Sequence, residues 1–99
     1  MVPDPNAERL ARNEALFRKL NQAQPAEPEG SNDFYCECGD LLCTARVGLT
    51  LDEYLAVRSD RRRFLIVPGH QVDEVEQVVE RHDGYWVVEK RPDLDEVGA

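Results

Sequence analysis

The chain has no long apolar run. No segment approaches the roughly 20 consecutive apolar residues that cross a bilayer. Residues 1–6 lack both the basic region and the apolar stretch of a secretory signal. Hydrophobic residues make up 41% of the 99 positions and charged residues 32%. We therefore expect a soluble, cytoplasmic protein with one small folded domain and some chain outside its core.

Catalytic motifs are also missing. The chain contains no His-Glu-x-x-His, no zinc deaminase signature, no glycine-rich phosphate loop and no nucleophile elbow. The folded part, expected at residues 33–91, leaves little room for a substrate pocket. We therefore expect a protein that is not an enzyme. A small zinc enzyme remains an alternative, with an open coordination position and Glu37 or Asp40 as the general base.

Basic residues are scarce relative to acidic ones. The chain has 12 Lys and Arg against 20 Asp and Glu, a formal net charge of −8, and most of the excess follows residue 30. Such a domain repels phosphate backbones, so we do not expect nucleic-acid binding. Residues 61–63, with Arg58 before them, form the one basic patch. We interpret it as a solvated corner, with contact to an acidic partner or a phosphate as the alternative.

Cysteines are few and clustered. All three, Cys36, Cys38 and Cys43, fall within eight residues around Gly39-Asp40. Cys36 and Cys38 point to the same side of an extended chain, and a turn at Gly39-Asp40 returns Cys43 toward them. Three thiolates can then converge on one Zn²⁺ at about 2.3 Å from each sulfur. An odd count in a reducing compartment favours metal ligands or free thiols over disulfides.

A fourth ligand is needed to complete a tetrahedral site. His70 follows Pro68-Gly69 in a tight turn after an apolar run, whereas His82 lies beside Asp83 near the expected end of a helix. We favour His70. Three cysteines with one histidine favour zinc over an iron–sulfur cluster. Buried free thiols, or a redox pair formed by Cys36 and Cys43, remain alternative interpretations.

The first segment is expected to be a helical arm. Asp4-Pro5 suits a helix start, and residues 7–22 are strong helix formers with Leu10, Phe17 and Leu20 on one narrow apolar stripe. Residues 1–24 form this arm, and the Pro-rich residues 25–32 form a flexible linker. The stripe either packs on the chain's own domain or binds a partner protein. Self-association through this helix is a further possibility.

The remaining pattern predicts a small α+β domain over residues 33–91. Strands are expected near residues 34–36, 45–49, 64–67 and 85–89. The apolar run at 64–67 is typical of a central strand. Helices are expected at residues 50–59, where Thr50 and Glu53 form a capping box, and at 73–84. The order predicts a mostly antiparallel sheet with two helices, a zinc knuckle and a separate N-terminal helix. Residues 92–99 are expected to be a disordered acidic tail.

Several segments resemble a family of small uncharacterised actinobacterial proteins. The resemblance rests on Phe34-x-Cys36-Glu37-Cys38-Gly39-Asp40, Leu49-Thr50-x-x-Glu53-Tyr54, Pro68-Gly69-His70, Val87-Val88-Glu89-Lys90 and Arg12-Asn13-Glu14-x-x-Phe17-Arg18. It covers most of the chain except the linker and the tail. The resemblance brings no activity, and it is consistent with Cys36, Cys38, Cys43 and His70 acting as one unit.

These expectations favour a non-enzymatic, zinc-stabilised adaptor or regulatory module. The folded domain would present a surface, and Leu10, Phe17 and Leu20 would bind a protein partner. The alternative is a redox or zinc-release switch, in which oxidation of the cysteines ejects the metal and loosens the domain.

Overall fold

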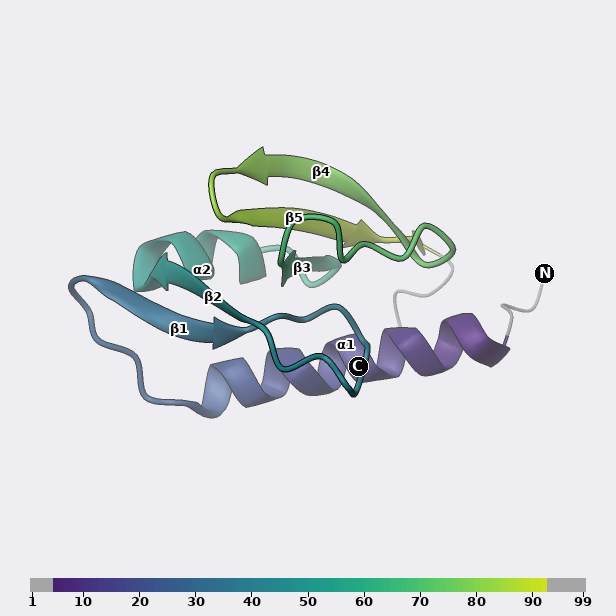
Figure 1. The fold of residues 1–99 in the computed structure, drawn as a ribbon, viewed down its shortest axis with the longest axis horizontal. Helices are drawn as coiled ribbons and strands as arrows, with labels where there is room; N and C mark the ends of the chain where they lie inside the picture. Colours follow the sequence, from purple (N-terminus) through teal and green to yellow (C-terminus); the bar gives the residue numbers. More distant parts are fainter. Residues whose placement is uncertain (1–4, 93–99) are drawn as a thin grey trace.

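The computed structural model describes residues 5–92. These residues form two helices and two antiparallel sheets (Figure 1). The elements are α1 (Pro5–Ala23), β1 (Ser31–Tyr35), β2 (Arg46–Thr50), α2 (Leu51–Arg58), β3 (Arg63–Ile66), β4 (Glu76–His82) and β5 (Tyr85–Lys90). The predicted small α+β class is confirmed, although the strands form one pair, β1-β2, and one triplet, β3-β5-β4. The predicted tail lies outside the described residues, except for Pro92.

Helix α2 begins where the capping box predicted. The Thr50 hydroxyl accepts a hydrogen bond from the Glu53 N–H (3.1 Å), and the Glu53 carboxylate accepts one from the Thr50 N–H (2.8 Å). Both donors would otherwise lack a partner within the helix. Tyr54 and Val57 then turn inward, and the Tyr54 ring stacks on Phe34 of β1 at 4.3 Å between centroids. The cap thus fixes the helix that joins the two sheets.

Residues 73–84 are not the predicted helix. Residues 76–82 form β4, which pairs with β5 through a hairpin whose His82 and Tyr85 face each other. The loop is Asp83-Gly84, and Gly84 has φ +86°. Asp-Gly between two such segments is a strong signal for a two-residue hairpin, and Val78 and Val79 prefer strands. Tertiary pairing overrides the helical spacing of the valines.

Strand β3 lies at the edge of its sheet and not at the centre, where the apolar run predicted it; β5 is central. Its residues Phe64, Leu65 and Ile66 are nevertheless fully buried. The free edge of β3 is covered by Glu37, whose N–H donates to the Leu65 carbonyl (2.7 Å) and whose carboxylate accepts from the Leu65 N–H (2.9 Å). An edge strand covered in this way can be as apolar as a central one.

Helix α1 packs along the domain, as Figure 1 shows for its position beside β1 and the β1–β2 connection. Its buried residues recur at intervals of three or four and form one stripe: Ala7, Ala11, Glu14, Phe17 and Asn21. Of the two outcomes left open by the sequence, packing on its own domain is the one observed. Neither helix within residues 5–92 combines the length and the apolar character that a bilayer-spanning segment requires.

Candidate metal centre

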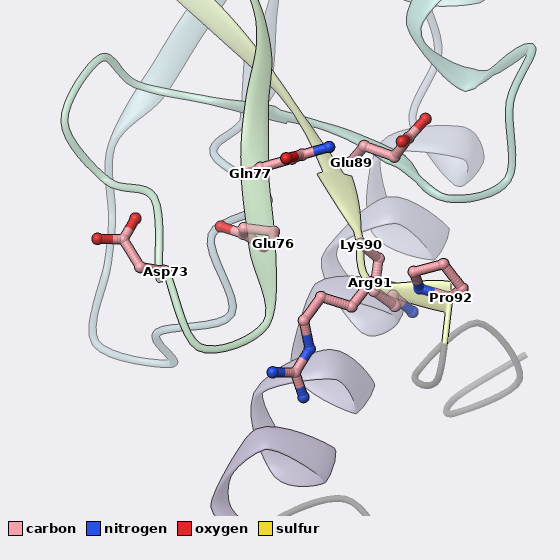
Figure 2. Close-up of a pocket in the computed structure, with 7 residues that line it drawn as sticks. All are labelled: Asp73, Glu76, Gln77, Glu89, Lys90, Arg91 and Pro92. Carbon is pink, nitrogen blue, oxygen red and sulfur yellow. The ribbon is translucent and has the colours of Figure 1, made fainter.

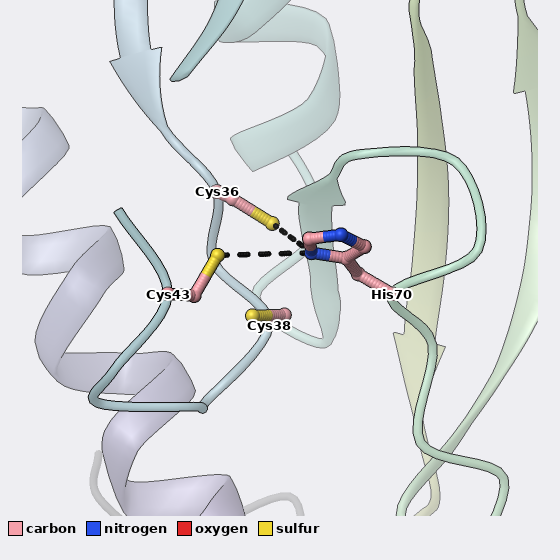
Figure 3. Close-up of side chains that lie close together, drawn as sticks. All are labelled: Cys36, Cys38, Cys43 and His70. Atoms are coloured by element: carbon pink, nitrogen blue, oxygen red, sulfur yellow. Dashed lines mark hydrogen bonds between the residues drawn. The ribbon is translucent and has the colours of Figure 1, made fainter. Parts of the chain in front are cut away.

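Four side chains from two connections meet at one point (Figure 3). Cys36, Cys38 and Cys43 lie in the connection between β1 and β2, and His70 lies between β3 and β4. Their sulfur and nitrogen atoms all lie within 4.8 Å of one another, close enough to bind a metal ion. The structure therefore brings together the four residues that the sequence singled out.

The knuckle, residues 36–43, is shaped by its backbone. The Cys36 N–H donates to the Ala45 carbonyl (3.1 Å) and continues the β1–β2 pairing. Gly39 then turns the chain at φ +84°, and the Cys43 N–H donates to the Asp40 carbonyl (3.0 Å). This turn returns Cys43 toward Cys36 and Cys38, as the spacing predicted.

His70 is positioned by a second turn. Its N–H donates to the Val67 carbonyl at 3.0 Å, and Gly69 between them has φ +90°. Proline followed by a glycine with positive φ is the sequence that a type II turn requires. The imidazole Nδ1 then faces the sulfurs, 3.6 Å from Cys36 Sγ and 3.7 Å from Cys43 Sγ. Nδ1 is thus the nitrogen available as a ligand.

The three cysteine thiols differ in pKa. A hydrogen bond from Cys36 lowers the pKa of the Cys38 thiol to about 5, whereas the same contact, followed by burial, raises the pKa of Cys36. Burial raises the pKa of Cys43. The Val67 N–H also donates to Cys36 Sγ at 3.3 Å, a contact that favours its thiolate. The cluster therefore favours a thiolate at Cys38 before the other two sulfurs lose their protons.

Glu37 points away from the metal centre, because neighbours in an extended chain face opposite sides. It is fully buried and its Oε2 accepts hydrogen bonds from Asn21 Nδ2 and the Tyr54 hydroxyl, both at 2.8 Å. Burial raises the pKa of its carboxyl, and the donated hydrogen bonds oppose that rise. Glu37 is thus occupied in the core, and its role as a general base beside the metal is not supported.

Glu37 and Asn21 form a buried contact that sequence reasoning missed. The Asn21 amide also donates to the Tyr35 carbonyl (3.0 Å) and accepts from the Tyr35 N–H (2.7 Å). The signal was present in Cys36-Glu37-Cys38, because two candidate ligands on one side of an extended chain place the residue between them on the other side. A carboxylate forced inward requires donors, and α1, α2 and β3 supply them.

The other candidates lie elsewhere. His82 ends β4, stacks on Tyr85 and contacts Glu80 with its Nε2 (2.7 Å), so it is not part of the cluster. In the basic patch, Arg63 contacts Glu80 at 3.2 Å and Glu89 at 3.4 Å. Arg63 therefore has acidic partners within its own chain.

The three residues predicted to bind a partner are placed differently from one another. Phe17 is buried against the domain, with its ring 6.4 Å from that of Tyr35, and cannot contact a partner in this conformation. Leu10 is half-buried, and Leu20 is exposed. The three do not form one open face, because the stripe that holds Phe17 is the side of α1 that packs inward.

The described residues also line a pocket and a groove. The pocket, of about 280 Å³, lies beside β4 and the end of β5, and its lining includes acidic Asp73, Glu76 and Glu89 and basic Lys90 and Arg91 (Figure 2). A groove of about 610 Å³ runs between α1 and the knuckle, lined in part by Leu10, Leu41, Leu42 and Val72. The pocket is slightly smaller than the usual range for ligand pockets, about 300–1,000 Å³, and none of the four candidate metal ligands lines the pocket or the groove.

No protein-family model, curated protein or solved structure matches this chain. The resemblance to the small actinobacterial family therefore stays a prediction, and the function must be argued from the centre itself.

Proposed function

We propose that Cys36, Cys38, Cys43 and His70 bind one structural Zn²⁺. The observation that carries the proposal is the convergence of three sulfurs and one imidazole nitrogen within 4.8 Å. A tetrahedral zinc places a sulfur and a nitrogen ligand about 3.6 Å apart, which matches the 3.6 and 3.7 Å from His70 Nδ1 to Cys36 and Cys43. Soft thiolates with one imidazole are a donor set that zinc prefers.

A structural role fits the number of donors. Four protein ligands complete a tetrahedron and leave no position for a reacting water. The metal would join two connections that lie 27 residues apart between Cys43 and His70. Structural zinc contributes about 10–16 kcal/mol in zinc-finger peptides, which are unfolded without it. This chain has in addition a buried apolar core that includes residues of β3 and β5. The proposed role is therefore to hold the two connections together on that core, without catalysis.

Metal analysis of the purified protein tests this proposal. We expect one zinc per chain, and a marked loss of affinity in His70→Ala. His82→Ala serves as the matched control, because His82 lies outside the cluster, and should retain the metal. A protein that contains no metal after purification and takes up none on titration would remove the basis of the proposal and leave buried free thiols as the better description.

We further propose that the domain acts as an adaptor or regulatory module that binds a protein partner. Support comes from large apolar side chains left exposed beside ordered structure. Leu16 and Leu20, one turn apart on the outer face of α1, are 47% and 43% exposed, and Leu41 and Leu42 at the tip of the knuckle are 61% and 88% exposed. Four exposed leucines on two neighbouring elements leave apolar surface in water, and burying that surface against a partner would be favourable.

Surface variants test the adaptor role without disturbing the core. Leu16→Ser with Leu20→Ser, and separately Leu41→Ser with Leu42→Ser, should reduce the capture of a partner while zinc content and thermal stability stay unchanged. Deleting residues 1–24 is a poorer test, because it also removes the buried Phe17 and Asn21. Equal capture by both double variants and the unaltered protein would argue against a leucine-mediated interface.

A further inference from the structure

Helix α1 packs against two segments of the domain. One segment is the knuckle, residues 36–43, and the other is the His70 loop, residues 67–75. The first half of α1 contacts both. These are the two segments that supply the candidate metal ligands.

The knuckle meets α1 at very short range. Asn13 Nδ2 donates to the Gly39 carbonyl at 2.9 Å. A Cβ added to Gly39 would lie 2.8 Å from the Leu10 carbonyl oxygen, so the helix backbone lies directly against the knuckle turn. No residue other than glycine fits this approach without displacement. The position of α1 therefore depends on the shape of the knuckle.

The His70 loop contacts α1 through apolar side chains. Ala7 and Ala11 of α1 pack on Val75 in a small cluster, with Leu10 and Val72 at its edge. Ala11 and Val75 are both 0% exposed. This cluster is separate from the main core, so its burial depends on the loop remaining beside the helix.

We propose that metal binding controls the docking of the first half of α1, an inference that rests on the proposed zinc site. The ion would join Cys36, Cys38 and Cys43 of the knuckle to His70 of the loop, and so fix the distance between these two segments. Loss of the ion lets the two segments move apart. Residues 5–14 of α1 then leave the domain and expose Leu10, Ala7 and Ala11.

The second half of α1 has an anchor that does not involve the ligand-bearing segments. The Arg18 guanidinium donates to the carbonyls of Asp60, Arg61 and Arg63 and lies over the Phe64 ring, 4.5 Å from its centroid. These groups belong to the corner before β3 and to β3 itself. Release is therefore partial, with the helix held near Arg18 and its first half set free.

Hydrogen–deuterium exchange on the full chain tests the release directly. After zinc is removed by a chelator, amides of residues 9–14 should exchange about 5- to 150-fold faster, the usual range of coupling between sites. Amides of the β3-β5-β4 sheet should keep most of their protection. Unchanged exchange in residues 9–14, or equal loss throughout the sheet, would overturn the inference.

Reciprocity supplies a second measurement. If zinc favours docking, undocking must weaken zinc binding by the same factor. Ala11→Asp places a charge in the buried cluster and should lower zinc affinity about 5- to 150-fold in competition with a chromophoric chelator. Ala23→Asp, the same change at an exposed position of the same helix, should leave affinity unaltered. Sheet amide protection in Ala11→Asp confirms that the domain is folded.

The outcomes separate the two proposals. One zinc bound with equal affinity by wild type and Ala11→Asp would leave the zinc site standing and refute metal-controlled docking. A wild-type protein that binds no zinc would refute the zinc site, and the inference with it.

Discussion

Gly39 is required for two reasons, because both its backbone conformation and its packing against α1 favour glycine. Its φ is +84°, and an added Cβ would meet the Leu10 carbonyl oxygen at 2.8 Å and Glu14 Cγ at 3.1 Å. Gly30 has nearly the same φ, +83°, with nothing within 4 Å of the added atom. Comparing the two glycines therefore separates the cost of backbone strain from the cost of the contact with α1.

Gly39→Ala should destabilise the zinc-loaded protein more than Gly30→Ala does. Gly30→Ala carries only the left-handed backbone strain, about 1–2 kcal/mol. Gly39→Ala adds the displacement of α1, about 1–3 kcal/mol more. Urea unfolding followed by circular dichroism measures both. Equal losses in the two variants would show that the contact between Gly39 and α1 contributes nothing.

Glu37 supplies the second residue-scale prediction. Glutamine has the same shape but places an NH₂ group where one carboxylate oxygen accepts hydrogen bonds. Oε1 faces the Leu65 N–H and Oε2 faces Asn21 Nδ2 and the Tyr54 hydroxyl, so the NH₂ group opposes one donor in one orientation and two donors in the other. Glu37→Gln should cost about 1–3 kcal/mol. The exposed Glu74→Gln is the control, and a stability loss no larger than that of the control would contradict the role given to Glu37.

At the scale of elements, the junction of α1 with the β4–β5 hairpin contains a buried pair of carboxyl groups. Glu14 is 0% exposed and Glu76 3% exposed. Within residues 5–92, neither Glu14 oxygen has an N–H donor. Burial, and then the adjacent Glu76, raise the pKa of Glu14 well above its usual value, while Lys90 opposes the shift. Burial also raises the pKa of Glu76. The folded protein thus retains protons that the unfolded chain releases.

This junction predicts the sign of a pH dependence. Because a raised pKa means that the folded state binds more protons, its contribution is complete below the unfolded value near 4.5 and is lost as pH rises through the raised pKa. Glu14→Gln, which removes the ionisable group and keeps its shape, should therefore gain stability relative to wild type as pH increases from 5 to 8.

Urea midpoints of zinc-saturated protein at both pH values measure the difference between Glu14→Gln and wild type. Glu29→Gln at an exposed position provides the control. A difference that is constant with pH would show that Glu14 does not hold its proton in the fold.

The elements also show what the sequence could and could not predict. The capping box at Thr50 and the turn at Pro68-Gly69-His70 are local, so they were predictable. Strand β4 was misassigned because Val72, Val75 and Val79 mimic helical spacing, and a register shift between Val78 and Glu80 interrupts the alternation of a strand. The Asp83-Gly84 turn was the better signal. The edge of β3 is covered by Glu37, which lies far away in sequence, and no local pattern encodes that contact.

At the scale of the whole molecule, zinc binding should release a definite number of protons and should therefore depend on pH. The Cys38 pKa of about 5 makes it largely thiolate at neutral pH, whereas the pKa values of Cys36 and Cys43 are raised. Binding near pH 7 should therefore release about two protons, and affinity should fall about 100-fold for each unit of decreasing pH.

Calorimetric titrations of zinc in buffers of different ionisation enthalpy count these protons. Release of three would show that Cys38 is protonated in the free protein, and release of none would contradict thiol ligation. His70→Ala is an informative comparison, because it retains all three sulfurs and should retain the release of about two protons.

The cover that Glu37 places on β3 has a consequence beyond the single chain. Its N–H and carboxylate bond the Leu65 carbonyl and N–H, groups that an exposed edge would offer to other molecules. Buried apolar residues with free edge groups are a template for pairing between chains. A chain whose knuckle has moved away would therefore be prone to aggregate through β3, and the same segment that gathers the cysteines also protects the protein's solubility.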